Sequence, residues 1–188
     1  LWFAAALPVN RQELLALAAR LRRTPTAPAE GYARELSEDE IHAKAHREFV
    51  GGLWEELGLK QIEFLQARGL KRTDSVLDVG CGALRGGIHL TRFLDPGNYT
   101  GVDRNASLIA AGYRELDEAG LADRNARLIV ETDFKLSGLG PFDWVLAQSL
   151  FTHLPINRIQ RCLHEVARVL KPEGRFYATY FPSDAHTP

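Results

Sequence analysis

Between residues 75 and 181, short apolar runs alternate with segments whose apolar positions recur every three or four residues. The short runs are rich in valine, isoleucine and leucine, which predicts buried parallel strands. The longer spacing predicts amphipathic helices. This alternation predicts an α/β fold with a doubly wound, mainly parallel sheet. The predicted strands are residues 75–79, 98–102, 127–131, 141–147 and 175–181.

The first part of the chain has a different pattern, which predicts helices without strands. Asn10 and Ser37 are each followed three positions later by a glutamate, and this spacing is typical of a helix-starting capping box. A chain of 188 residues has room for one domain and a terminal extension. We therefore expect an N-terminal helical extension over residues 1–45 and the main domain over residues 46–188.

The strongest local signal lies where the first predicted strand turns into a helix. The turn contains Gly80 and Gly82. Glycine tolerates positive φ and lets a ligand approach bare backbone. The start of the following helix presents unpaired N–H groups and a partial positive charge. The stretch therefore predicts a loop that binds an anionic or nucleotide-like ligand.

Two cofactor classes use such a loop, and the spacing separates them. In the dinucleotide fingerprint G-x-G-x-x-G, the third glycine would stand where this chain has Arg85, whose bulk would keep the helix from a pyrophosphate. Asp78, Gly80 and Gly82 instead match (D/E)-x-G-x-G. The stretch thus resembles motif I of the class I S-adenosylmethionine (SAM) methyltransferases. A third glycine that this family often has is Leu84 here.

The resemblance implies S-adenosyl-L-methionine as cofactor and S-adenosyl-L-homocysteine (SAH) as product. It assigns the ribose hydroxyls to Asp103, at the end of the second predicted strand, although a solvated turn aspartate is the alternative. After the third strand, Asp133 suits the adenine amine and Phe134 the purine face, with a core role as the alternative for Phe134. The predicted cofactor-binding residues are Asp78, Gly80, Cys81, Gly82, Asp103, Arg104, Asp133, Phe134, Gln148 and Ser149.

The segment after the fourth predicted strand resembles the family's motif IV and following loop, where the methyl group meets its acceptor. The implied chemistry is in-line displacement, for which the protein supplies alignment. An oxygen or nitrogen acceptor can require a base, and His153 is the candidate because histidine titrates near neutrality. Capping of the following helix is an equally good interpretation of His153.

A glycine pair before an aromatic-rich helix marks the segment that precedes motif I. Glycine lowers helix stability by about 0.5–1 kcal/mol, so its presence indicates close approach or hinge motion. We expect residues 46–58 to form a lid, with His46, Gly52 and Trp54 facing the cofactor or acceptor. Packing of Trp54 in the core, with the segment as scaffold, is the alternative.

Composition limits the remaining possibilities. A formal net charge of −1 gives no general attraction to nucleic acid, so we expect a small-molecule or sugar acceptor. Cys81 and Cys162 have neither metal-ligand nor disulfide-framework spacing, which favours a reducing cytoplasm. We expect no metal site. The apolar residues 1–9 are too few to span a bilayer, which takes about 20 residues.

The resemblance covers residues 46–181 and implies seven strands, the last two in an antiparallel hairpin. The chain stops after its fifth predicted strand and contains no methionine, so we expect it to be C-terminally incomplete, without the hairpin. The leading hypothesis is SAM-dependent methyl transfer to a small-molecule or sugar-type oxygen or nitrogen acceptor. The alternatives are an NAD(P)-type Rossmann oxidoreductase and a non-catalytic partner protein with the SAM-binding fold.

Overall fold

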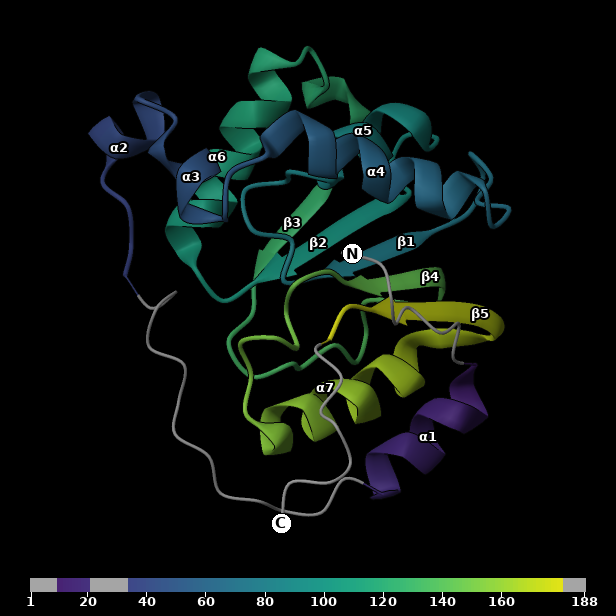
Figure 1. Ribbon diagram of the computed structural model, residues 1–188. Coiled ribbons are helices and arrows are strands. Elements are labelled where there is room, and N and C mark those ends of the chain that lie inside the picture. Colours follow the sequence, from purple (N-terminus) through teal and green to yellow (C-terminus); the bar gives the residue numbers. More distant parts are fainter. Residues whose placement is uncertain (1–9, 21–33, 181–188) are drawn as a thin grey trace.

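A five-stranded parallel sheet forms the centre of the computed structural model, which describes residues 10–20 and 34–180 (Figure 1). Its strand order is β3-β2-β1-β4-β5, and every neighbouring pair is parallel. The predicted doubly wound, parallel α/β fold is therefore confirmed. The strands are β1 (Val76–Val79), β2 (Tyr99–Asp103), β3 (Arg127–Val130), β4 (Phe142–Ala147) and β5 (Leu170–Ala178).

Helices cover both faces of the sheet. One face carries α4 (Trp54–Gln66), α5 (Gly87–Phe93) and α6 (Ala106–Glu118), and the other carries α7 (Ile156–Val169) with α1 (Arg11–Arg20) outside it (Figure 1). The short helices α2 (Glu38–His42) and α3 (Ala45–Phe49) lie beside α6, and a single 3₁₀ turn, η1 (Ala122–Arg124), precedes β3.

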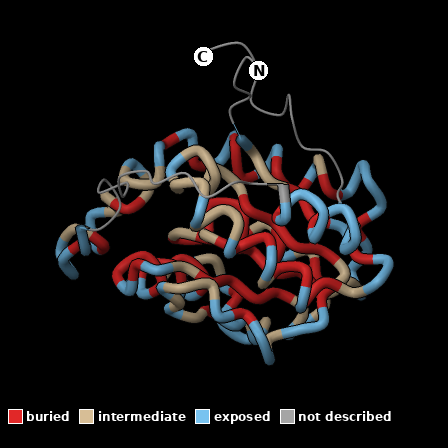
Figure 2. Tube along the Cα trace, turned by 90° about the horizontal axis from the view of Figure 1, so that it is seen from below, coloured by how far each residue is buried: buried red, intermediate tan, exposed pale blue. Residues whose placement is uncertain are grey.

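The three central strands, β1, β2 and β4, are buried on both sides because successive side chains enter different cores (Figure 2). Val76 packs under α4 and α5, whereas its neighbour Leu77 packs against α7. Helix α1 joins the second core through Leu14 and Ala18, both fully buried. The predicted extension thus packs on the main domain, and the boundary at residue 45 stays a prediction.

Both predicted capping boxes form. The Asn10 side chain accepts hydrogen bonds from the backbone of residues 12 and 13, and the Glu13 carboxylate accepts one from the Asn10 N–H. Ser37 and Glu40 make the same reciprocal pair at the start of α2. The helical run is broken between α2 and α3, because Lys44 adopts φ = 59° there.

Strand β5 also differs from its prediction. It begins at Leu170, directly after α7, and pairs there with Phe142. The register then shifts, so that Arg175 pairs with Trp144 and the turn-like residues 171–174 form an irregularity within the strand. The antiparallel hairpin that the family resemblance implies is not among the strands of the described ranges. Residues 1–9, and the last predicted strand residue at position 181, lie outside those ranges.

Gly58 explains how closely α4 approaches α5. A Cβ there would overlap the Arg85 carbonyl oxygen and lie 2.8 Å from the His89 ring. The glycine therefore permits close helix packing, one of the two roles expected for it. Nothing in this contact requires hinge motion.

We predict that Gly58→Ala destabilises the protein by roughly 1–3 kcal/mol through overpacking, although alanine is intrinsically the better helix former by about 1 kcal/mol. The measurement is the free energy of urea unfolding. Lys60→Ala, on the exposed face of the same helix, is the control and should change stability by less than about 0.5 kcal/mol. A Gly58→Ala protein as stable as wild type would contradict the packing argument.

Candidate functional site

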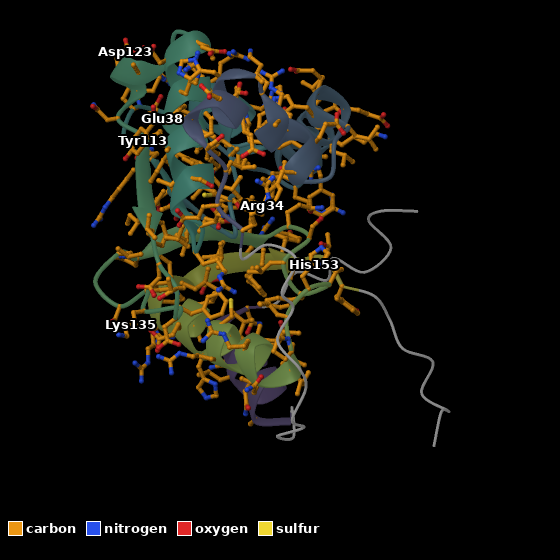
Figure 3. All side chains as sticks on the ribbon, turned by 90° about the vertical axis from the view of Figure 1, so that its left-hand side faces the viewer. Arg34, Glu38, Tyr113, Asp123, Lys135 and His153 are labelled. Atoms are coloured by element: carbon orange, nitrogen blue, oxygen red, sulfur yellow. The ribbon has the colours of Figure 1, made fainter. Side chains whose placement is uncertain are left out.

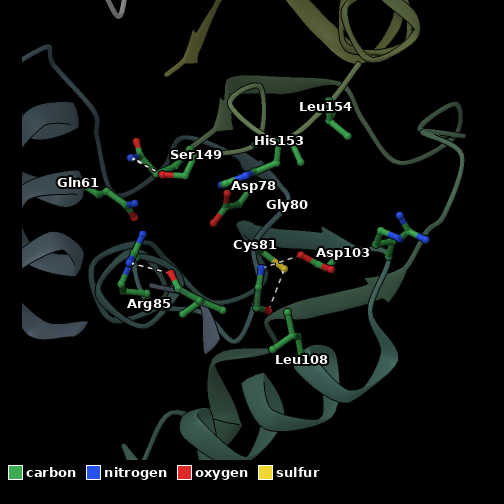
Figure 4. Close-up of a pocket in the computed structure, with 16 residues that line it drawn as sticks. Gln61, Asp78, Gly80, Cys81, Arg85, Asp103, Leu108, Ser149, His153 and Leu154 are labelled. Atoms are coloured by element: carbon green, nitrogen blue, oxygen red, sulfur yellow. Dashed lines mark hydrogen bonds between the residues drawn. The ribbon is translucent and has the colours of Figure 1, made fainter. Parts of the chain in front are cut away.

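Two adjoining cavities open at the carboxyl ends of the central strands, where ligands bind in open parallel sheets. One, of about 140 Å³, lies over the loop that follows β1 (Figure 4). The other, of about 360 Å³, lies beyond Asp103 toward α7. Both are lined by Gly80, Asp103, Arg104, Leu150, His153 and Leu154. We call them the loop cavity and the outer cavity.

The loop glycines adopt the left-handed conformation predicted for them, with φ = 77° at Gly80 and 55° at Gly82. A Cβ on Gly80 would lie 3.0 Å from Leu150, and one on Gly82 would lie 3.2 Å from Val50. The missing side chains therefore let two apolar residues close over the loop. Sequence analysis missed both of these cavity-lining residues.

Leu84, where the family often has glycine, also adopts a positive φ, at 72°. Such a conformation is unfavourable for a leucine. Its side chain is fully buried, in the core beneath α4 and α6, where a Cβ on Gly112 would approach it to 3.0 Å. Burial of the side chain offsets the backbone strain, so the loop keeps its shape without the third glycine.

Asp103 connects the loop to the end of β2. One carboxylate oxygen accepts a hydrogen bond from the Gly82 N–H at 2.9 Å, and the other accepts one from the Asn105 N–H at 2.9 Å. Burial raises the pKa of this carboxyl above its ordinary value, opposed by these backbone donors. A carboxylate has about four acceptor sites, more than the three backbone groups, of Gly82, Arg104 and Asn105, that donate to this one. The carboxylate is thus held in a fixed orientation between the two cavities.

Asp78 lies deeper in the loop cavity and is only 5% exposed. Its carboxylate accepts a hydrogen bond from the Tyr99 hydroxyl at 2.9 Å. Burial raises the pKa of Asp78 to about 6, although Tyr99 and Arg85 partly oppose this effect. In Figure 4, Asp78 projects between Asp103 and Arg85. A buried acid in this state suits a cationic group of a ligand.

Several side chains that the sequence interpretation did not assign to the site also line the loop cavity, and three of them precede or belong to the glycine-rich stretch. These three are Val50, Gln61 and Arg85. Gln61 extends from α4 over Gly86, where an added Cβ would overlap its amide oxygen and lie 2.7 Å from its Cδ. The Gly51–Gly52 pair and the glycines of residues 86–87 were the available signals, but a glycine does not reveal which side chain approaches it.

The residues after β4 close the loop cavity from the other side. The Ser149 N–H donates to the Thr179 hydroxyl at 2.7 Å, and the Gln148 amide donates to the Ser149 hydroxyl at 3.3 Å. His153 lines both cavities, and Figure 3 shows it at the level of the sheet, between the helical layers. Pro155 is the N-cap residue of α7, so His153 does not occupy the cap position.

Asp133 does not fit its predicted adenine role. Its carboxylate pairs with Arg158 and Arg161 of α7, each at 2.7 Å, and lines neither cavity. Phe134 does line the outer cavity, with the Arg158 guanidinium 4.9 Å from its ring centroid. The arginines draw the acid toward α7 and leave the ring at the cavity.

The prediction that His46 and Trp54 face the cofactor is wrong. His46 is 1% exposed, its Nε2 lies 2.7 Å from the Glu115 carboxylate, and its ring meets the edge of Trp54. Neither His46 nor Trp54 lines a cavity. Trp54 packs in the core, which was the alternative interpretation of this residue. Burial opposes ionisation of Glu115, but hydrogen bonds from His46 and Arg47 outweigh it and lower the pKa of Glu115 to about 2.

The described ranges contain no cluster of three or more histidine, cysteine, aspartate or glutamate side chains arranged to hold a metal ion. None of their helices combines the length and apolar character that crossing a bilayer requires.

Comparison with known proteins identifies the family. The family model described as Methyltransferase domain matches residues 76–174. The chain belongs to this methyltransferase family. The probable methyltransferase ltbC of Aspergillus luteorubrus is 30% identical over 111 residues, which are 56% of this chain and 39% of that protein. The chain therefore spans well under half the length of this curated relative.

Solved structures share the methyltransferase fold. Protein PH0226 of Pyrococcus horikoshii OT3 aligns with a TM-score of 0.59 and 23% identity, over 76% of this chain and 65% of its own. Magnesium protoporphyrin IX methyltransferase of Synechocystis PCC 6803, solved with bound SAH, aligns with a TM-score of 0.54 and 14% identity, over 73% of this chain and 57% of its own. The glycopeptide N-methyltransferase MtfA, solved with SAM, aligns with a TM-score of 0.57 and 19% identity, over 64% of this chain and 53% of its own. These likenesses confirm the predicted fold class.

The raised pKa of Asp78 predicts a pH-dependent stability difference. The folded protein holds this proton up to pH of about 6, whereas an unfolded aspartate loses it near pH 3.9. Unfolding therefore releases a proton between these values, and the contribution of Asp78 to stability falls as pH rises through this window. Asp78→Asn should be more stable than wild type at pH 8, by at most about 3 kcal/mol, with little difference at pH 4.

The measurement is urea unfolding of the free protein at both pH values. Asp117→Asn, an exposed aspartate on α6, is the matched control and should show no such dependence. A stability difference for Asp78→Asn that is the same at pH 4 and pH 8 would mean that burial does not perturb this carboxyl.

Proposed function

We propose that this chain carries the SAM-binding site of a methyltransferase and takes part in methyl transfer to a small-molecule or sugar-type oxygen or nitrogen acceptor. The observation that carries the proposal is the hydrogen bond between Gly82 of the glycine loop and the Asp103 carboxylate at the end of β2. It holds an acid beside the glycine loop in one cavity. Family membership, and the SAM or SAH in several solved relatives, support the proposal.

The residues of the two cavities fit the parts of this cofactor. The fixed Asp103 carboxylate can accept hydrogen bonds from the ribose hydroxyls. Asp78, buried and poised to ionise, suits the α-ammonium group. Phe134 and Leu150 offer apolar surface to the adenine ring. Arg104 lines both cavities, and the backbone of Cys81, Gln148 and Ser149 completes the proposed binding set.

The cofactor supplies an activated methyl group on a sulfonium, and the protein orients it. Val50 and Leu150 close over the glycine loop and exclude water from the cavity. We assign to His153 the acceptance of a proton from the acceptor's hydroxyl or amine group, because it lines both cavities. The acceptor class rests on the absence of any strong net charge, which disfavours nucleic acid.

The two alternatives fit less well. The side chain of Arg85, which stands in place of the third dinucleotide-binding glycine, extends toward residues 50–52, and the family match is to methyltransferases. A non-catalytic partner protein would share the binding site, so binding alone does not separate it from an enzyme. Turnover does.

We predict that SAH binds with near-micromolar affinity, about −8 kcal/mol, and that NAD gives no measurable heat in the same titration calorimetry. Asp103→Ala should weaken SAH binding by roughly 1–3 kcal/mol, because charge-assisted hydrogen bonds are lost. Asp117→Asn is the control of unchanged affinity. SAH that fails to bind at millimolar concentration would reject the proposed function, and full affinity in Asp103→Ala would reject the ribose assignment.

Isotope-labelled SAM, offered with separate pools of sugars, phenols and amines, tests for methyl transfer by mass spectrometry. Once an acceptor is found, His153→Asn should lower kcat by about 10²–10⁴-fold if His153 takes its proton. The rate should then regain part of this loss as pH rises, because the acceptor ionises without help. Unchanged kcat in His153→Asn would remove the base assignment and leave the binding site standing.

A further inference from the structure

The segment from residue 50 to residue 53 brings Val50 to the wall of the loop cavity and has an unfavourable backbone conformation. Gly51, Gly52 and Leu53 follow one another with φ = 96°, 61° and 45°. Positive φ is strained for leucine, and the Leu53 side chain is 58% exposed, so burial contributes little to holding it there. Some other interaction must keep this wall in place.

Arg85 makes that interaction. Its Nη1 donates hydrogen bonds to the carbonyl oxygens of Val50, at 3.1 Å, and Gly52, at 3.0 Å. The arginine is 9% exposed, and charge-assisted hydrogen bonds of a buried group are among the stronger ones in proteins. Nη1 carries two N–H groups, so both can be used by these carbonyls.

A second anchor holds the same part of the chain away from the cavity. Arg47 donates two hydrogen bonds to the Glu115 carboxylate, at 2.8 and 2.7 Å, and His46 contacts the same group. This cluster fixes α3 on α6. The N–H groups of Val50 and Gly52 donate to carbonyl oxygens of α3, whereas their own carbonyl oxygens accept from Arg85. Arg85 is thus placed to hold the turn against the cavity.

We propose that Arg85 is a positioning residue, which builds the Val50 wall of the cofactor site by holding residues 50–53 and does not bind the cofactor's carboxylate. The consequence for binding rests on the proposed function. Val50 approaches the position of a Gly82 Cβ to 3.2 Å, so it closes the loop cavity over the loop itself. Release of the wall would open the cavity to water and weaken every ligand that fills it.

Hydrogen–deuterium exchange of the ligand-free protein tests the anchor directly. The reporters are the amides of Gly51 and Gly52, which donate to the carbonyls of Glu48 and Arg47. In Arg85→Met, exchange within residues 50–57 should accelerate roughly tenfold, while β1 and α6 keep their wild-type rates. Arg92→Met, an exposed arginine on α5, is the matched control with unchanged exchange.

Arg85→Lys keeps the charge but lacks the guanidinium geometry, so its exchange should lie between wild type and Arg85→Met. If Arg85→Met does not fold, Arg85→Lys tests the proposal by itself, because exchange within residues 50–57 should be faster in Arg85→Lys than in wild type. Exchange within residues 50–57 that is unchanged in a folded Arg85 variant would overturn the proposal.

Two ligands separate wall-building from direct contact. SAH has the amino-acid carboxylate, whereas 5′-methylthioadenosine has the adenosine and sulfur but lacks it. If Arg85 holds the wall, Arg85→Met should lose affinity for both by a similar factor, about tenfold. If SAH alone binds more weakly, Arg85 is a carboxylate ligand and the proposal fails. If neither ligand binds wild type, the proposed function fails, and exchange in the free protein still decides the role of Arg85.

Discussion

The hydrogen bond from the Gly82 N–H to the Asp103 carboxylate is the contact on which the site depends. It forms because β1 and β2 are adjacent and parallel, so the loop after one strand meets the end of the other. Gly82 must take a positive φ to aim its N–H at that acid, and Leu84 continues the same turn at the cost of backbone strain. The order of the strands, the conformation of the loop and the orientation of the Asp103 carboxylate therefore depend on one another.

Glycines in and around this loop make room for protein side chains. The sequence interpretation expected bare backbone for a ligand, yet the positions of the missing Cβ atoms are taken by Leu150 at Gly80, Val50 at Gly82 and Gln61 at Gly86. These three side chains then line the loop cavity. The glycines therefore shape the site indirectly. Because they have no side chains, neighbouring side chains can reach the cavity wall.

Local signals in the sequence were sufficient for the first four strands, the helix caps and the glycine loop, because each depends on residues close in sequence. The roles of Asp133 and His46 were mispredicted because their partners are distant: Arg158 and Arg161 for the acid, and Glu115, 69 residues away, for the histidine. An aspartate at a strand end has the same sequence signal whether it faces a cavity or two arginines on the next helix.

The buried charges around the loop cavity lower the stability of the ligand-free protein. Burial raises the pKa of both Asp78 and Asp103, and the nearby Asp103 carboxylate further disfavours ionisation of Asp78. The Arg85 cation does not cancel them, because its Nη1 is turned to the carbonyls of residues 50 and 52. A ligand with positive charge would relieve this repulsion on binding, whereas a neutral one would not. Under the proposed function, the ammonium and sulfonium of SAM meet this requirement, so the strain in the free protein is also a source of selectivity for its ligand.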